Sequence, residues 1–214
     1  MKEKMVKLYG KSGNKVALHV IPGHFATSHS HINFYIDITS LKTRVNEAEQ
    51  VAKVIAADYA KNTTIVDTIV CMDGTEMIGA FLAKEFEKRG FFNRNQHDTI
   101  YVVTPEYNSN NQIIFRDNNM MAVEGKNVIL LLATTTTGLT IRRAVECIHY
   151  YGGTLQGISS IFSTVKEVDG MEVESVFTEE DVPGYTAYAR TECPYCQKGM
   201  RIEAMVNGFG YSRL

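Results

Sequence analysis

The sequence predicts an α/β protein built on a parallel sheet. Short apolar runs alternate with amphipathic stretches over residues 65–163, which is the order that parallel strands joined by helical crossovers produce. The apolar runs are continuous, as expected for strands that are buried on both faces of the sheet. The chain has 214 residues, of which 44% are hydrophobic, so a substantial core can form.

Antiparallel strands are expected before this core. Met5–Tyr9 and Val16–Ile21 flank the turn-forming residues 11–14, and together they predict a hairpin. Apolar residues alternate from Ile32 to Ile38, which indicates a third strand. We therefore expect three regions: hood strands at 1–42, an α/β core at 43–180 and a C-terminal appendage at 181–214.

Within the core, helical periodicity and apolar runs define the expected elements. Residues 104–125 lack a clear pattern, and a segment of that length is usually a functional loop or flap. The predicted helices are Thr43–Lys61, Ile78–Lys88 and a third that contains Ile141–Ile148 and is ended by Gly152-Gly153, and the predicted strands are Ile65–Met72, Thr99–Val103, Val128–Leu132 and Thr154–Ser163.

The turn after the strand Val128–Leu132 carries the strongest functional signal. Thr134, Thr135, Thr136 and Thr137 follow the strand, and Gly138 precedes the next helix. Free backbone N–H groups and the positive end of the helix dipole converge at such a turn. The threonine hydroxyls add donors, and a glycine lets the chain approach a ligand closely. The turn therefore predicts a phosphate site, with an ordinary threonine-capped connection as the alternative.

A second turn of this kind follows the preceding strand. It contains Asp73, Gly74, Thr75 and Glu76, and a helix begins directly after it. Ligands of parallel sheets bind beyond the carboxyl ends of the strands. We therefore expect this turn and the threonine-rich turn to belong to one site.

Three stretches resemble the type I phosphoribosyltransferases, and most of all the orotate phosphoribosyltransferases. They are GHFATSHSHINFYIDITSL from residue 23, CMDGTEMIGAFLA from residue 71, and EGKNVILLLATTTTGLTI from residue 124. The resemblance covers roughly residues 16–165. It implies a parallel sheet flanked by helices, with an N-terminal β hood. The C-terminal segment lies outside the resemblance, and we expect it to form a cysteine hairpin appended to this core.

The resemblance also implies a function. The chain would bind phosphoribosyl pyrophosphate or a nucleoside 5′-monophosphate and transfer ribose 5-phosphate to a base such as orotate, with Mg²⁺ on the pyrophosphate. Asp73, Gly74, Thr75 and Glu76 would hold the pyrophosphate. The 5′-phosphate would be held by Thr136, Thr137, Gly138 and Thr140, with Thr134 and Thr135 beside them.

The sequence departs from the family pattern at three places, and the missing acids and the missing lysine favour weak activity. Leu132 and Ala133 stand where the family has two acidic residues that hold the ribose hydroxyls, and neither side chain can accept a hydrogen bond. Leu139 replaces a glycine. The loop that carries a catalytic lysine in the family has Arg116 as its only cation here, and arginine cannot donate a proton near neutral pH. The alternative function is a non-catalytic nucleotide-binding or regulatory protein on the same fold.

The C-terminal segment reads as a hairpin around Cys193-Pro-Tyr-Cys196. The tetrapeptide matches the redox pair of glutaredoxins, but it lacks the helical context that lowers a thiol pKa there. It also resembles one knuckle of a zinc ribbon, which supplies two of the four ligands that zinc requires. A metal-free turn is the third reading. The other two ligands could be His24, His29 or His31, or the cysteines of a symmetry mate; Cys71 and Cys147 lie in apolar stretches and are expected in the core.

Composition and charge limit the binding partners and the cellular location that can be expected. The net charge of −2 gives no electrostatic case for binding nucleic acid or a membrane, and no apolar run approaches the ~20 residues of a membrane span. The N-terminal residues lack the apolar core of a signal peptide. With four cysteines and no such signal, we expect a protein of the reducing cytoplasm. We also expect a homodimer whose partner is a phosphorylated ribose or nucleotide.

Overall fold

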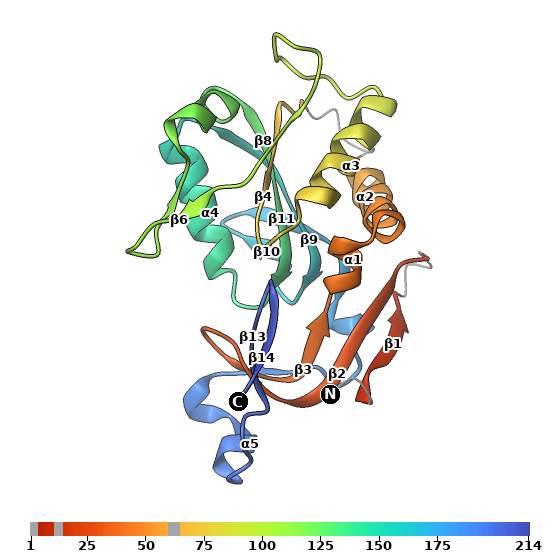
Figure 1. Ribbon diagram of the computed structural model, residues 1–214, viewed down its shortest axis with the longest axis vertical. Coiled ribbons are helices and arrows are strands. Elements are labelled where there is room, and N and C mark those ends of the chain that lie inside the picture. The colour runs from red at the N-terminus through yellow and green to blue at the C-terminus, as the bar shows by residue number, and fades with distance from the viewer. Residues whose placement is uncertain (1–3, 11–14, 60–64) are drawn as a thin grey trace.

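The computed structural model describes residues 4–10, 15–59 and 65–214. The predicted hairpin turn at 11–14 and the last two residues of the predicted helix Thr43–Lys61 lie outside the described residues. An α/β core forms one end of the molecule, and a β hood that contains both termini forms the other (Figure 1). The N-terminal and C-terminal segments therefore meet in the hood.

The core is a sheet in the order β10-β11-β9-β8-β4-β5. Neighbouring strands are parallel except for β10, which runs antiparallel to β11. This confirms the predicted α/β class. The strands are β4 (Thr68–Cys71), β5 (Tyr101–Val103), β8 (Asn127–Thr135), β9 (Thr154–Ser163), β10 (Glu167–Val168) and β11 (Met171–Thr178).

Helices cover both faces of this sheet. On one face α1 (Thr39–Thr43), α2 (Val45–Tyr59) and α3 (Glu76–Lys88) pack together, and α4 (Leu139–Tyr150) covers the other (Figure 1). Because side chains alternate along a strand, the apolar run of β8 serves both sides. Ile129, Leu131 and Ala133 join the α2 and α3 side, whereas Val128, Leu130 and Leu132 join the α4 side.

Two features of the core differ from the sequence prediction. β8 extends to Thr135, so the first two threonines belong to the strand, where they pair with Phe162 and Ser163 of β9. Threonine is β-branched and suits a strand, but the prediction ended the strand where the apolar run stops. β11 was not predicted, because Glu172 and Glu174 interrupt its apolar residues.

The hood is a second sheet, in the order β12-β3-β2-β13-β14, with β1 paired to β2. The predicted N-terminal hairpin is confirmed, because β1 and β2 pair antiparallel. The strands on either side of the cysteine turn differ from the expected hairpin: β12 pairs with β3, and β13 pairs with β2 and β14. The C-terminal segment thus completes the hood sheet. The hood elements are β1 (Val6–Tyr9), β2 (Ala17–Ala26), β3 (His31–Asp37), β12 (Ala187–Tyr188), α5 (Pro194–Gln197), β13 (Ala204–Asn207) and β14 (Gly210–Arg213).

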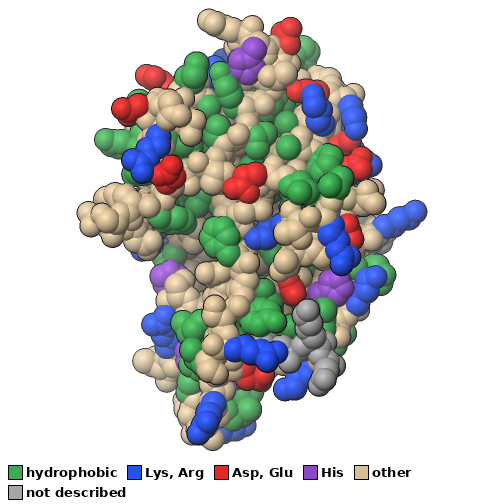
Figure 2. All heavy atoms as spheres, in the orientation of Figure 1, with side chains coloured by type: hydrophobic (Ala, Val, Ile, Leu, Met, Phe, Trp, Pro, Cys, Tyr) green, Lys and Arg blue, Asp and Glu red, His purple; other side chains and the backbone are tan. Residues whose placement is uncertain are grey.

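The segment after β5, in which the sequence shows no clear pattern, contains regular secondary structure. It forms a small hairpin of β6 (Glu106–Tyr107) and β7 (Ile113–Ile114), followed by a 3₁₀ helix at Asp117–Ala122. On the face shown in Figure 2, basic and acidic side chains are interspersed over the core. Among the described helices, none is long and apolar enough to cross a membrane.

Candidate functional site

The two predicted turns meet at one edge of the core sheet. β4 and β8 are adjacent parallel strands, with Cys71 opposite Leu131, so the turns that follow them lie side by side. A cavity of about 440 Å³ opens there between the core and the hood, a volume typical of small-molecule sites. Its walls include Thr134, Thr135, Thr136, Thr137, Gly138, Thr140, Arg143 and Asp73 from the core, Thr27, Ser28, His29, Tyr35 and Tyr185 from the hood side, and Asn207, Gly208 and Phe209 from the hairpin of β13 and β14, the C-terminal hairpin.

The threonine-rich turn has the geometry of an anion site. Gly138 is the N-cap of α4 and has φ = +72°, in the left-handed region that favours glycine. The first N–H groups of an α-helix have no partner within the helix. In α4 no side chain caps them and no acidic residue lies in the first turn, so they can donate to an anion. Thr164, directly after β9, fixes the turn, because its hydroxyl donates to the carbonyl of Thr136 at 2.9 Å.

Two buried hydroxyls on the cavity walls have no hydrogen-bond partner among the described residues. They are Thr135 Oγ1 at the end of β8 and Tyr185 Oη on the hood side. Burial raises the pKa of Tyr185, with Glu179 adding to the effect, so this phenol stays protonated and able to donate. Buried polar groups are normally paired, and a ligand rich in oxygen atoms would supply the missing partners.

Arg143 is a cation that the sequence analysis did not single out. It lies in the first turns of α4 and lines the cavity beside the threonines. A guanidinium there suits a phosphate, which it can bind through two parallel hydrogen bonds. The sequence signal that could have identified Arg143 is its position five residues after Gly138, in the helix that follows the turn.

Asp73 is the residue of the second turn that lines the cavity. It has φ = +56°, and burial raises the pKa of its carboxyl, an effect that Lys42 opposes and Glu76 adds to. The buried Lys42 donates to the carbonyls of Asp73 at 2.5 Å and of Gly208 at 2.6 Å. A Cβ on Gly208 would lie 2.7 Å from Asp73 Cβ, so glycine is needed for this close approach. The C-terminal hairpin is thereby joined to the turn after β4.

The other residues predicted for the pyrophosphate turn and the flexible loop lie outside the cavity wall, and Thr75, Glu76 and Arg116 bond to protein groups. The buried Thr75 hydroxyl donates to the carbonyls of Met72 and Leu131, which fixes the turn to β8. Glu76 accepts a hydrogen bond from Thr104. Gly74, Thr75, Glu76 and Arg116 are not among the described residues that line the cavity; Arg116 instead donates twice to Glu106, at 2.9 and 2.7 Å.

The positions of the missing acidic pair are fully buried. Leu132 packs into the α4 side of the core and Ala133 into the opposite side, and both are 0% exposed. Neither side chain can hold a ribose diol. Asp73 is therefore the carboxylate available to a ligand among the described wall residues.

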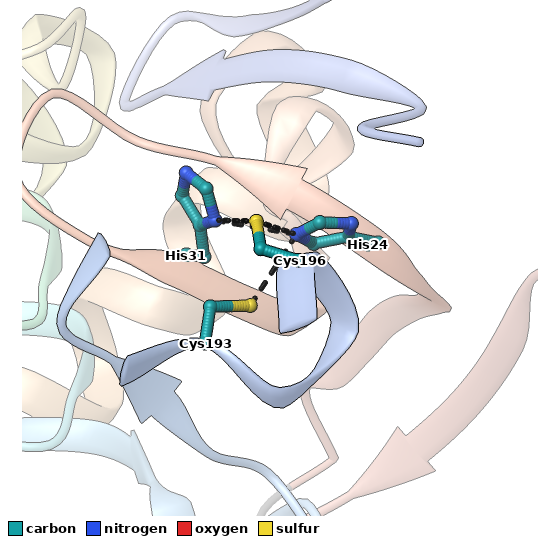
Figure 3. Close-up of side chains that lie close together, drawn as sticks. All are labelled: His24, His31, Cys193 and Cys196. Carbon is teal, nitrogen blue, oxygen red and sulfur yellow. Dashed lines mark hydrogen bonds between the residues drawn. The ribbon is translucent and has the colours of Figure 1, made fainter. Parts of the chain in front are cut away.

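The three histidines that the sequence offered as metal ligands separate into two groups. His29 lines the cavity, whereas His24 and His31 face Cys193 and Cys196, all within 4.8 Å of one another (Figure 3). Cys71 and Cys147 are buried in the core, as predicted.

The bridge from Lys42 allows a direct test. We expect Lys42→Met to release the tip of the C-terminal hairpin, because two charge-assisted hydrogen bonds are lost, each worth about 1.5–3 kcal/mol before the burial cost of the ammonium is subtracted. Hydrogen exchange of residues 204–213 should accelerate. Lys84→Met on the exposed side of α3 is the matched control. Unchanged exchange at the hairpin would show that Lys42 does not hold it.

Comparison with known proteins agrees with this fold. A curated orotate phosphoribosyltransferase from Pelotomaculum thermopropionicum is 23% identical over 202 residues, which cover 93% of this chain and 94% of that protein. The structure of Mycobacterium tuberculosis H37Rv orotate phosphoribosyltransferase in complex with 5-phospho-α-D-ribosyl 1-diphosphate matches with a TM-score of 0.51 at 15% identity, over 69% of this chain and 82% of that one. The structure of adenine phosphoribosyltransferase from Thermoanaerobacter pseudethanolicus matches with a TM-score of 0.51 at 15% identity, over 83% of this chain and 96% of that one. No family model matches the chain.

The fold is that of the type I phosphoribosyltransferases, as the sequence motifs predicted. In sequence, the chain is similar to a curated orotate phosphoribosyltransferase over nearly its whole length.

Proposed function

We propose that the cavity binds phosphoribosyl pyrophosphate or a nucleoside 5′-monophosphate, and that the protein transfers ribose 5-phosphate to a base of the orotate type. The observation that carries the proposal is the uncapped N-terminus of α4, preceded by four threonines and by a glycine at φ = +72°. The complex of the M. tuberculosis relative with 5-phospho-α-D-ribosyl 1-diphosphate supports the choice of ligand.

The 5′-phosphate would lie on the turn from Thr134 to Thr140. Backbone N–H groups at the start of α4 and the threonine hydroxyls donate to it, and the helix dipole favours its charge. Arg143 adds a guanidinium on the same side of the cavity. The base would then lie toward the hood, where Tyr35 and His29 form the wall.

The pyrophosphate would lie toward Asp73. Magnesium ions commonly bind through one or two carboxylates together with the phosphates of the substrate, so an Asp73 carboxylate that lines the cavity fits this role. The ion would neutralise the leaving pyrophosphate. Asp73 would orient it from the protein side, and the contact between Lys42 and the Asp73 carbonyl fixes the backbone there.

Catalysis should be slow relative to relatives that carry the acidic pair. A nitrogen of the base attacks C1′ while the bond to pyrophosphate breaks, and positive charge develops on the ribose ring. Acids beside the ribose would stabilise that charge, but Leu132 and Ala133 offer none.

The test is a turnover assay with phosphoribosyl pyrophosphate, Mg²⁺ and a panel of bases that includes orotate, uracil and adenine. We expect release of pyrophosphate with one base, at a rate that depends on Mg²⁺. Binding of phosphoribosyl pyrophosphate without turnover of any base would contradict transfer and favour the nucleotide-binding alternative. No binding at all would contradict the ligand assignment.

The homodimer stays a prediction. Light scattering on the purified protein at several concentrations would give the oligomeric state.

A further inference from the structure

Four potential metal ligands converge where the C-terminal segment crosses the hood. His24 lies in β2, His31 begins β3, Cys193 is the N-cap of α5 and Cys196 lies within α5. Their side chains point toward a common centre (Figure 3). His24, His31 and Cys193 are buried. Residues about 170 positions apart in the chain thus supply one compact cluster.

Four of the six distances among these ligand atoms are close to those of a tetrahedral zinc site, and all six are within 4.8 Å. With bonds of about 2.3 Å to sulfur and 2.0–2.1 Å to nitrogen, ligand atoms lie about 3.3 Å apart for two nitrogens and about 3.6 Å apart for nitrogen and sulfur. Here His24 Nε2 is 3.2 Å from His31 Nδ1. Cys196 Sγ lies 3.7 Å from His24 Nε2 and 3.2 Å from His31 Nδ1, and Cys193 Sγ lies 3.4 Å from His24 Nε2.

Neighbouring residues fix the tautomer and the ring orientation of His24 as metal binding requires. Its Nδ1 lies 3.1 Å from the carbonyl of Met200; a carbonyl only accepts, so Nδ1 carries the proton and the lone pair of Nε2 faces the cysteines. Metal-bound histidines commonly have such a partner on the other ring nitrogen. Tyr195 stacks on the same ring, with 5.3 Å between centroids, and holds its orientation.

We propose that His24, His31, Cys193 and Cys196 bind one Zn²⁺ and that this ion fastens the C-terminal segment to the hood. Two thiolates and two imidazoles suit zinc, whereas magnesium and calcium prefer oxygen ligands. Four protein ligands complete the tetrahedron, which is typical of structural sites. The site lies apart from the cavity and takes no part in the proposed transfer.

The zinc ligands are connected to two parts of the cavity wall, the β2–β3 turn and the C-terminal hairpin. The β2–β3 turn lies between His24 and His31, and its residues Thr27, Ser28 and His29 line the cavity. Arg190, just before the cysteines, donates to the carbonyls of Thr27 and Ser28. The metal would thus fix the hood side of the cavity.

The second part is the C-terminal hairpin. The Glu203 amide donates to the carbonyl of His24 at 2.8 Å, and β13 then pairs with β2 from Ala204. The hairpin tip at Gly208 reaches the turn of Asp73 through Lys42. A zinc ion at the start of this segment would therefore order the hairpin that lines another part of the cavity wall, a consequence for ligand binding that rests on the proposed function.

The first experiment is metal analysis of full-length protein purified without chelator and without a metal-affinity column. We expect about one equivalent of zinc per chain in the unmodified protein, and about a tenth or less in Cys193→Ser and in His31→Asn. The matched controls, His29→Asn from the same turn and Cys147→Ser from the core, should keep their zinc. Less than about a tenth of an equivalent in the unmodified protein, or a Cys193–Cys196 disulfide in alkylated protein, would overturn the proposal.

A second measurement keeps the proposal testable if the ligand variants fail to fold. Unmodified protein is stripped of metal with a chelator and then titrated with Co²⁺ and Zn²⁺. We expect tetrahedral cobalt absorption with a sulfur charge-transfer band, which Zn²⁺ abolishes. Hydrogen exchange should slow on zinc binding at residues 24–31 and 193–213. Zinc binding without slower exchange would overturn the fastening role.

These outcomes are separate from the proposed function. Zinc content and exchange can follow the prediction when no phosphoribosyl ligand binds, and that result would reject the transferase proposal alone. Where the ligand does bind, chelated protein should have several-fold lower affinity for phosphoribosyl pyrophosphate, and zinc should restore it.

Discussion

Replacing Gly138 with valine is expected to abolish most phosphate binding while leaving the fold intact. Gly138 has φ = +72°, where a residue with a Cβ costs about 1–2 kcal/mol. The added Cβ would also lie 3.3 Å from Val168 Cγ2, a tight contact that the turn or the Val168 side chain relieves by moving a few tenths of an ångström. Because the α4 amides must point at one spot to hold a phosphate, we expect affinity for a 5′-monophosphate to fall at least about tenfold, or 1.4 kcal/mol, as measured by calorimetric titration.

Gly125→Val separates backbone strain from ligand contact. Gly125 has φ = +67° with open space around its Cβ position, and it precedes β8 at the edge of the sheet opposite the cavity. We expect a similar loss of stability with unchanged ligand affinity. Equal affinity of the Gly138 and Gly125 variants would contradict a phosphate site at the turn.

Restoring the acidic pair with Leu132→Asp and Ala133→Asp is expected to destabilise the protein strongly. The sequence alone suggests that two acids here would strengthen ribose binding. The structure reverses this expectation, because both positions are 0% exposed and face opposite layers of the core. Leaving an unpaired charge in the interior costs about 3–5 kcal/mol, and Leu132 also loses its packing. Denaturant unfolding should show a loss of at least about 4 kcal/mol at pH 8.

The pH dependence of this loss of stability shows whether buried charge causes it. Burial would raise the folded-state pKa of the new acids above their unfolded value, so the electrostatic penalty is absent below the unfolded pKa, grows as the pH rises from the unfolded to the folded pKa, and is constant above it. The deficit should therefore be smaller at pH 4 than at pH 8. Leu139→Asp, at a 40% exposed position, should cost little. A stable double variant with tighter phosphoribosyl pyrophosphate binding would show that this strand end is open to the ribose.

The parts of the fold that sequence predicted well depend on local pattern. The continuous apolar run of β8 and the helical periodicity of α2 and α3 follow from which faces are buried. The turn at Gly138 was predictable for the same reason, since strand, threonines, glycine and helix are contiguous. Prediction failed where a strand lacked such a pattern, as in β11, whose glutamates interrupt its apolar residues.

The rest of the site depends on contacts between distant residues. Lys42 reaches Gly208 across 166 positions, and Cys193 approaches His24 across 169. The sequence contained three candidate histidines but no local feature that assigns His24 and His31 to the cysteines and His29 to the cavity. Tyr185 and Arg143 were missed because an isolated tyrosine or arginine has many other uses in a protein.

The central claim is that the turn from Thr134 to Thr140 holds a phosphate. The most direct test is calorimetric titration of the unmodified protein with orotidine, uridine and adenosine, each against its 5′-monophosphate. For at least one pair, we expect the monophosphate to bind ten times more tightly or better, since each charge-assisted hydrogen bond contributes about 1.5–3 kcal/mol. Equal affinities within every pair would contradict the claim and would leave the turn as an ordinary connection between β8 and α4.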